Sequence, residues 1–426
     1  MSEHLTPVIV GSQRTAFARA FGAYAGAGNL ALLTHVLNAL VDRYALSPNS
    51  VDLVVAGAVS SHARDWNLAR EATVRSKLGR EVSAITSTIA CGTSLSNALI
   101  IADKIRSGEI DVGIAAGADT ISDSPIAVSP KLNQRLIKLS RAKTPLDKLK
   151  VASKGFSLAE LAPNPMTPGE PMTGLSMGEH AQLMANEWSI SRGAQDAWAM
   201  GSHQKASAAF ADGFHDDLIA PFNHLHRDDN LREQLSADDM ARLKPVFDRK
   251  KGTLTAANST PLTDGAGAVL IASEAWAKAQ GLPVLAYLRS GQVASMDYVS
   301  GEGLLIAPTL AIAKQLRRAN YSLADFDLFE IHEAFAAQVL CTLRALANTD
   351  YCTEKLGHEA ALGEIPHDKI NPTGSSLAYG HPFAATGARL LGSAAKQLSM
   401  GRAKRALLSV CTAAGQGVVA VLEAPN

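Results

Sequence analysis

Short apolar runs alternate along this chain with longer stretches in which apolar residues recur every three or four positions. The apolar runs predict buried strands, and the longer stretches predict helices that cover a sheet. The predicted strands are Pro7–Arg14, Leu53–Ala58, Val112–Gly117, Pro283–Arg289, Leu328–Ile331 and Ala406–Val410, and the predicted helices are Asn29–Tyr44, 93–106, Pro308–Ala319 and 386–399. Strands that alternate with helices are typical of βαβ units, so the pattern predicts an α/β fold with sheets buried between helical layers.

The order of elements is repeated in the two halves of the chain. An opening strand, a helix, a Ser-containing turn and a second strand occur in both, and the interval from Ser47 to Ser322 is the same as that from Asp52 to Asp327. This repetition predicts a duplicated fold. We expect an N-terminal half over 1–121 plus 252–277, an inserted loop domain over 122–251, and a C-terminal half over 278–426.

The insertion contains a strongly basic stretch, residues 131–154. Eight basic side chains stand against one acidic side chain, Asp147, and leucine or isoleucine residues are interleaved at helical spacing. One interpretation is a helical pair that packs on the body and keeps a solvated basic face. The others are a docking face for a protein partner or a lipid surface, and a basic rim for a phosphorylated ligand. The sequence leaves all of these open.

Composition excludes several classes of protein. The 426 residues are 47% hydrophobic, and 40 basic side chains balance 40 acidic ones, which argues against disorder and against a nucleic-acid partner. No signal peptide and no apolar run of about 20 residues is found, so we expect a soluble, cytoplasmic protein. The four cysteines make no Cys-x-x-Cys pair and do not fall at zinc spacing, so we expect no metal site. Phosphate-loop and dinucleotide-binding motifs are also missing.

Two cysteines and two histidines are the candidates for chemistry. Cys91 lies in Ile-Ala-Cys-Gly-Thr-Ser, His332 in His-Glu-Ala-Phe, His381 in Ala-Tyr-Gly-His-Pro, and Cys411 in Ser-Val-Cys-Thr-Ala-Ala-Gly-Gln-Gly. A thiol where a strand meets a helix has its thiolate stabilised by the helix N-terminus. Together the two thiols suggest a reaction in which one sulfur bonds the substrate and the other moves a proton. Cys341 and Cys352 lie in no motif, and we expect them to be structural.

These four motifs, their order and the duplicated layout resemble the thiolases over essentially the whole chain. His332-Glu-Ala-Phe-Ala-Ala-Gln338 and Ala378-Tyr-Gly-His-Pro-Phe-Ala-Ala-Thr-Gly-Ala-Arg389 are closest to the beta subunit of fatty-acid oxidation trifunctional complexes. The resemblance implies two βαβαβαββ halves in a five-layered α-β-α-β-α core with an inserted loop domain. It also implies an acyltransferase that cleaves 3-ketoacyl-CoA with free coenzyme A, giving acetyl-CoA and a shortened acyl-CoA, with no tightly bound cofactor.

The resemblance assigns a role to each candidate residue. Cys91 is expected to attack the ketone and carry the acyl chain, with His381 as its base. Cys411 is expected to protonate the acetyl-CoA enolate and then to deprotonate coenzyme A. His332 is expected to hold a water that, with His381, donates hydrogen bonds to the thioester oxygen. Backbone N–H groups of Cys91 and Ala413 are expected to form the second oxyanion pocket.

Further expectations follow from the same likeness. Met177, Asn258, Ser259 and Thr260 are the expected contacts of the acyl-CoA substrate and coenzyme A. A homodimer or tetramer is expected, with a possible hydratase/dehydrogenase alpha subunit as partner. The alternatives are a biosynthetic acetoacetyl-CoA thiolase and a non-catalytic lipid-binding protein of the same fold. The chain departs from the family where glycine pairs are common, at Ser375-Ser376 and Ala413-Ala414; alanine matters there only if the backbone needs a positive φ.

Overall fold

Strands from both ends of the chain form one continuous sheet in the computed structural model, which describes residues 5–162, 164–165 and 169–425. The strand order is β10 (Leu328–Ile331), β11 (Arg405–Thr412), β12 (Gln416–Glu423), β9 (Ala286–Ser295), β1 (Pro7–Arg14), β8 (Thr263–Ser273), β5 (Val112–Asp119), β3 (Leu53–Gly57) and β4 (Ser83–Thr86), with β2 (Ala18–Arg19) on β8. Only two residue pairs, Val8 with Tyr287 and Ile9 with Ala286, join β1 to β9. The continuous sheet therefore consists of an N-terminal sheet and a C-terminal sheet, which are joined where β1 pairs with β9.

The two sheets have the same topology. In the N-terminal half, β5 runs parallel to β3 and antiparallel to β8; in the C-terminal half, β11 runs parallel to β10 and antiparallel to β12. The N-terminal order is β1, α1 (Asn29–Tyr44), β3, α2 (Leu68–Arg75), β4, α3 (Thr93–Arg106), β5 and β8, which is the predicted βαβαβαββ. The C-terminal half repeats it with β9, α10 (Pro308–Ala319), β10, α11 (Ala336–Leu346), α14 (Thr386–Ser399), β11 and β12. Where β4 would recur there is only one parallel bridge, between Phe329 and Ile370.

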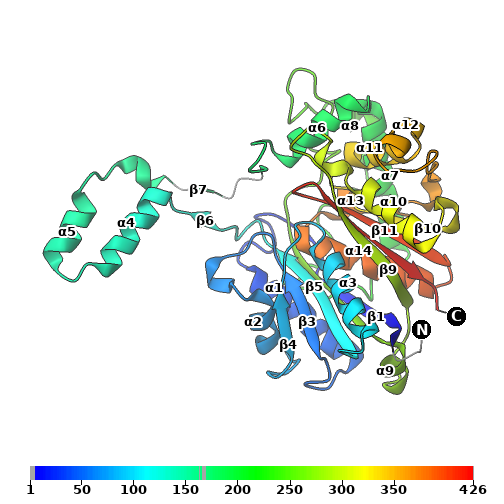
Figure 1. Ribbon diagram of the computed structural model, residues 1–426, viewed down its shortest axis with the longest axis horizontal. Helices are drawn as coiled ribbons and strands as arrows, with labels where there is room; N and C mark the ends of the chain where they lie inside the picture. The colour runs from blue at the N-terminus through cyan, green and yellow to red at the C-terminus, as the bar shows by residue number, and fades with distance from the viewer. Residues whose placement is uncertain (1–4, 163, 166–168, 426) are drawn as a thin grey trace.

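Three apolar cores separate five layers. The first core lies between α1, α2 and the N-terminal sheet, the second between the two sheets around α3 and α14, and the third between the C-terminal sheet and α10 and α11. The middle helices must pack closely because both of their faces are covered. A Cβ placed on Gly387, in the first turn of α14, would lie 2.4 Å from the backbone nitrogen of Leu95 in α3. The predicted five-layered α/β fold is confirmed (Figure 1).

The predicted elements all occur, and one of them is displaced. The strand expected over Pro283–Arg289 is β9, which begins at Ala286 and continues to Ser295. The apolar pattern ends near Arg289, but the next four residues are only partly buried and still pair with β12. Backbone pairing therefore extends the strand beyond the part that its side chains identify.

The insertion over 122–251 has two structurally different parts. Its later helices, α6 (Met177–Glu187), α7 (Arg192–Ala211) and α8 (Ala237–Ala241), pack on the C-terminal half, where α6 and α7 contact α11, and α7 also contacts the short helix α13 (Ser376–Tyr379). The earlier part is an arm that begins with β6 (Ile126–Ala127), continues through α4 (Pro130–Arg141) and α5 (Pro145–Ser153), and returns through β7 (Asn164–Pro165). Two further short helices, α9 (Glu274–Ala279) and α12 (Thr349–Glu354), lie in the C-terminal part of the chain.

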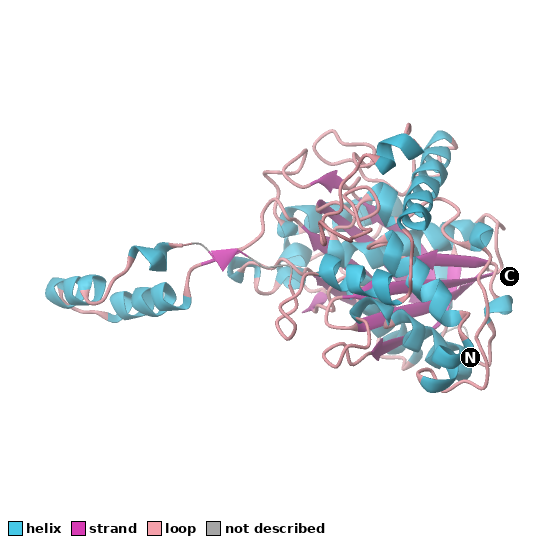
Figure 2. Ribbon diagram, turned by 90° about the horizontal axis from the view of Figure 1, so that it is seen from above, coloured by secondary structure: helices cyan, strands magenta, loops and turns pink. Residues whose placement is uncertain are grey.

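The arm projects away from the body (Figures 1 and 2). No residue of α4 or α5 is buried, and the two helices contact each other. Arg135 of α4 holds the return segment through two 3.0 Å hydrogen bonds to the carboxylate of Glu160. The interpretation of the basic stretch as a helical pair is confirmed, but its packing on the body is wrong. The division of the chain into residues 1–121 plus 252–277, 122–251 and 278–426 stays a prediction.

Within the described ranges, none of the helices has the length and apolar character needed to cross a membrane.

Candidate active site

Cys91 lies in a tight turn between β4 and α3. Ala90, directly before it, has a φ of 46°, a left-handed conformation that is uncommon for alanine. Thr93 fastens the turn because its hydroxyl accepts from Ile89 N at 2.9 Å and donates to Ala90 O at 2.7 Å. The turn thereby presents the partly exposed Cys91 side chain at the N-terminus of α3.

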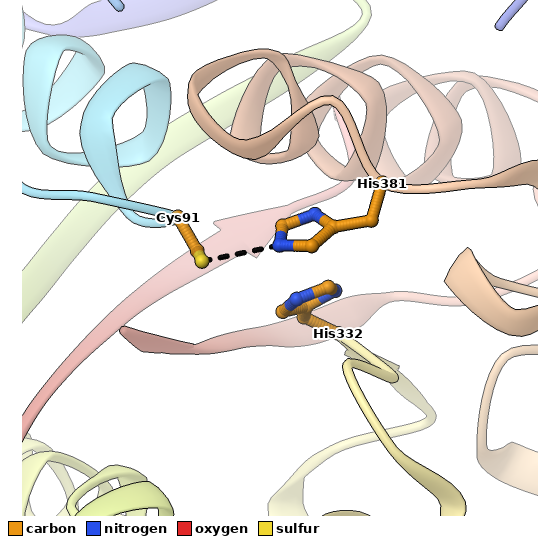
Figure 3. Close-up of side chains that lie close together, drawn as sticks. All are labelled: Cys91, His332 and His381. Carbon is orange, nitrogen blue, oxygen red and sulfur yellow. Dashed lines mark hydrogen bonds between the residues drawn. The ribbon is translucent and has the colours of Figure 1, made fainter. Parts of the chain in front are cut away.

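His381 meets this thiol from the other half of the molecule. Its Nε2 lies 3.1 Å from Sγ of Cys91 (Figure 3). Its Nδ1 lies 2.6 Å from the hydroxyl oxygen of Thr386 at the start of α14. The preceding Gly380 has a φ of 102°, and a Cβ there would lie 2.8 Å from Thr263. Glycine is therefore required where the chain turns to present the imidazole.

His332 stacks on His381. It follows the end of β10, and its backbone N–H donates to Ser409 O of β11 at 2.8 Å. The two ring centroids are 4.1 Å apart with planes inclined at 43°. The Nδ1 atom of His332 is hydrogen-bonded to Ser376, whereas its buried Nε2 has no hydrogen-bond partner among the described residues.

Cys411 completes the group of four predicted residues. It is 1% exposed near the end of β11, and desolvation, followed by the effect of Cys91, raises the pKa of its thiol well above the ordinary value. The Cys91 turn also presses on this strand, since a Cβ on Gly92 would lie 2.8 Å from Cγ2 of Thr412. The structure therefore brings Cys91, His332 and His381 together and places Cys411 on the strand against which the Cys91 turn packs, and the catalytic roles of all four stay predictions.

Burial keeps these groups uncharged at neutral pH. Desolvation raises the pKa of the Cys91 thiol to about 12, against the opposing effect of the backbone N–H of Ala413. Desolvation, with a smaller contribution from Arg389, lowers the pKa of His381 to about 3. The resting pair is thus a thiol beside a neutral imidazole, not the helix-stabilised thiolate expected from the sequence. Its proton can move to His381 during attack.

Sγ of Cys91 and one ring nitrogen from each histidine lie within 4.8 Å of one another. Three donors of this kind could hold a transition metal. That the centre works without a metal stays a prediction, and the chemistry proposed below uses these groups as nucleophile, base and hydrogen-bond donor.

Comparison with known proteins identifies the family. Residues 7–275 match the model of the thiolase N-terminal domain, and residues 282–424 match that of the thiolase C-terminal domain. The chain belongs to the thiolase family. It is 41% identical over 421 residues to a 3-ketoacyl-CoA thiolase of Shewanella amazonensis, covering 97% of this chain and 96% of that one, and equally identical, with the same coverage, to one from Pseudoalteromonas translucida.

Solved thiolase structures match the fold over nearly the full length. The human mitochondrial 3-ketoacyl-CoA thiolase superimposes with a TM-score of 0.82 at 27% identity, covering 99% of this chain and 100% of the human chain. A structure of the human enzyme in complex with CoA gives the same TM-score with 99% of both chains covered. An acetyl-CoA acetyltransferase from Bacillus anthracis has a TM-score of 0.81 at 28% identity, covering 99% of both chains.

One departure from the usual thiolase glycines has a structural consequence. Ala414 has a φ of 61°, so alanine occupies a backbone conformation that favours glycine, whereas Ser375 is extended at −146°. Ala414 N donates to a carboxylate oxygen of the buried Glu170 at 2.6 Å, and the hydroxyl of Tyr298 donates to the other oxygen at 3.2 Å. Glu170 therefore fastens the loop that holds Ala413 against Cys91.

The predicted substrate contacts lie in different places. Ser259 and Thr260 line a surface groove together with Arg19, Arg232 and Phe247. Asn258 lies beneath it, fully buried, and its amide is hydrogen-bonded to Asp196, Thr253 and Thr255. Met177 packs in the apolar cluster that contains Phe247, Phe335 and Cys411. These four residues stay predictions as substrate contacts.

The sequence analysis gave no role to three side chains that orient the reactive ones. Thr386, Glu170 and Ser376 contact His381, the Ala413 loop and His332 respectively. Thr386 and Ser376 lie inside motifs that were already noted, so their hydroxyls were an available signal. Glu170 is 241 residues before Cys411 in the chain, and nothing in its local sequence indicates that contact.

Proposed function

We propose that this thiolase cleaves 3-ketoacyl-CoA with free coenzyme A, giving acetyl-CoA and an acyl-CoA shortened by two carbons. The observation that carries the proposal is the 3.1 Å contact between Sγ of Cys91 and Nε2 of His381, with the Cys91 turn packed against Thr412, the neighbour of Cys411. A nucleophile paired with a base, and a separate proton carrier, are what carbon–carbon cleavage of a ketone requires.

The first half-reaction forms an acyl-enzyme. Cys91 sulfur attacks the ketone carbon while its proton passes to Nε2 of His381, and the backbone N–H groups of Cys91 and Ala413 stabilise the oxyanion. The carbon–carbon bond then breaks, and the electron pair forms the enolate of acetyl-CoA. Cys411 gives its proton to the enolate carbon, so acetyl-CoA leaves and a thioester remains on Cys91.

The second half-reaction returns the enzyme to its starting state. The Cys411 thiolate takes the proton of the incoming coenzyme A thiol, and that sulfur attacks the thioester. Cys91 leaves and recovers its proton from His381. The imidazolium formed on His381 gives the proton back readily because burial lowers its pKa.

The groove that contains Ser259 and Thr260 is the proposed entry for the coenzyme A moiety. Arg19 and Arg232 line it and can pair with phosphate groups. Thr260 N donates to Ala334 O at 3.1 Å, which ties the groove to the segment that follows His332. The hydroxyl of Ser259 is buried at the wall of this groove and has no partner among the described residues.

A chain-length series of 3-ketoacyl-CoA substrates tests the function. We expect turnover on long and medium chains, with mass spectrometry showing the acyl group on Cys91. Activity confined to the four-carbon substrate would favour a biosynthetic acetoacetyl-CoA thiolase, an alternative that the likeness to the Bacillus anthracis enzyme keeps open. Tight binding without acetyl-CoA release would favour a lipid-binding protein.

We also propose a cytoplasmic homodimer or tetramer that acts in β-oxidation, with a hydratase/dehydrogenase subunit as partner. Support for self-association comes from β4, an edge strand whose Ile85 is 43% exposed, because unpaired edges with apolar side chains favour pairing. Sedimentation analysis of the wild type and of Ile85→Lys tests it. A monomeric wild type would contradict the proposal, and a monomeric variant alone would support it.

A further inference from the structure

The two stacked histidines have different hydrogen-bond partners. His381 faces a thiol on one side and Thr386 on the other, whereas the one hydrogen bond recorded for the His332 ring among the described residues joins Nδ1 to Ser376 at 2.8 Å. The remaining nitrogen of His332, Nε2, is buried and has no partner among the described residues, and one ring nitrogen of His332 belongs to the group of three donor atoms that includes Sγ of Cys91. Which nitrogen of His332 carries the proton therefore decides what it can do there.

Arg389 determines how Ser376 can bond. Its guanidinium, buried at 2% exposure, donates to Ser375 Oγ at 3.0 Å and to Ser376 Oγ at 2.9 Å, and arginine has no acceptor atom. The oxygen of Ser376 is thus an acceptor for Arg389, and its single hydroxyl proton needs an acceptor of its own. The only one recorded among the described residues is Nδ1 of His332.

Burial keeps His332 neutral, and Arg389 contributes to this. Burial, followed by the effects of His381 and Arg389, lowers the pKa of His332 well below its ordinary value. A neutral imidazole has one donor and one acceptor nitrogen. If Nδ1 accepts from Ser376, Nε2 carries the proton.

We propose that Ser376 and Arg389 are positioning residues that hold His332 as the Nε2–H tautomer, so that the histidine presents a hydrogen-bond donor to the reaction centre. His381 has the opposite arrangement, with Nε2 as the acceptor for the Cys91 proton. Two imidazoles 4.1 Å apart thereby act as one base and one donor. This inference rests on the proposed function and extends it to His332, which the family resemblance implies holds a water beside the thioester oxygen.

The test is the ¹⁵N spectrum of histidine-labelled protein at neutral pH, because protonated and unprotonated ring nitrogens have well-separated shifts. The His332 signals are assigned by their loss in His332→Gln. We expect Nε2 protonated and Nδ1 unprotonated in the wild type. An unprotonated Nε2 overturns the proposal without any variant, and the spectrum does not depend on thiolase activity, so its failure is separate from failure of the proposed function.

Ser376→Ala and Ser375→Ala form a matched pair. Both remove a fully buried hydroxyl that Arg389 contacts, but Ser375 donates to Ile331 O and does not touch His332. In Ser376→Ala we expect mixed tautomers and a fall in kcat of about tenfold with KM unchanged, as for partial loss of a transition-state donor. In Ser375→Ala we expect the wild-type spectrum. A single Nε2–H tautomer in both variants, or the same disturbance in both, would contradict a role for Ser376.

Discussion

β5 in the N-terminal half of this thiolase and β11 in the C-terminal half are equivalent strands, but the residues near their ends have different roles. β5 and β11 occupy the same position in their sheets, each parallel to one neighbour and antiparallel to the other. β5 ends at Asp119, which accepts hydrogen bonds from Val59 N, from Ser60 N and Oγ, and from Ala384 N. Cys411, a proposed proton carrier, is the next-to-last residue of β11, whereas Asp119 is the last residue of β5. Duplication thus supplied two equivalent strands, and the groups near their ends have different roles.

Asp119 is nevertheless connected to the reaction centre. The bond from Ala384 N, at 2.8 Å, fastens the segment after His381 to the N-terminal half, and the charge of Asp119 contributes to raising the pKa of Cys91. The first turns of α3 and α14 are joined in the same way, because Ala388 N donates to Ser94 Oγ at 2.8 Å. The N-terminal half therefore holds in place the segment of the C-terminal half that follows His381.

The largest expected loss of turnover results from replacing either of the two thiols. We expect Cys91→Ser to lower turnover by at least about 10⁴-fold, because the alcohol is a much poorer nucleophile at neutral pH. Cys411→Ser is expected to lose overall turnover by a similar factor, because it removes the proton carrier. It should still accept an acyl group from an acyl-CoA thioester, which intact-protein mass spectrometry detects as an adduct on Cys91.

Asp119→Asn is the matched control at the equivalent strand end. It keeps the size of the side chain and is expected to cost stability, about 1–3 kcal/mol for disturbed buried hydrogen bonds, with turnover reduced far less than in Cys411→Ser. Urea unfolding and steady-state kinetics measure both effects. If turnover in Asp119→Asn fell as far as in Cys411→Ser while the protein stayed folded, the contrast between the two halves would be lost.

The next effect concerns the charge of Cys91. Because its pKa is raised to about 12, the thiolate fraction grows with pH over the whole accessible range. We expect iodoacetamide labelling of Cys91 to rise about tenfold for each pH unit from 6 to 9. Labelling is selective because the other three cysteines are buried. A plateau near neutral pH would show a stabilised thiolate, as the sequence alone had suggested.

The difference between the stabilised thiolate expected from the sequence and the raised pKa of Cys91 in the structure shows what the sequence alone could not predict. The alternation of strands and helices could be predicted because periodicity is local, and the motifs around Cys91, His332 and His381 identified side chains that the fold brings together. The βαβαβαββ order came from the resemblance to the thiolases. The pKa of Cys91 could not be predicted, because desolvation depends on side chains that tertiary packing brings from both halves. Glu170 was missed for the same reason: its contact with Ala414 spans 244 residues.

A smaller effect is expected at the contact between the central helices. Gly387→Ala places a methyl group 2.4 Å from the backbone nitrogen of Leu95, which must move away. We expect a loss of about 1–3 kcal/mol in the free energy of unfolding, typical of overpacking. Gly201→Ala in α7 is the control, since a Cβ there meets nothing within 4 Å, and it should stabilise the helix by up to about 1 kcal/mol. Equal effects would mean that the two helices are not tightly packed.

The smallest effect on turnover is expected in the arm. None of the hydrogen bonds and ion pairs recorded for the described residues of α4 and α5 reaches the body, and neither helix buries a residue. We therefore expect replacement of residues 129–162 by a short Gly/Ser linker to leave kcat within about twofold, as for changes remote from the site, and unfolding within about 0.5 kcal/mol. The double variant Lys138→Glu with Lys150→Glu reverses charge but keeps the two helices. If the arm docks an acidic partner, the linker replacement and this double variant both lose co-purification of that partner and keep turnover. Retained co-purification in both would leave the arm without a docking role, and a large fall in kcat would show that it does reach the catalytic centre.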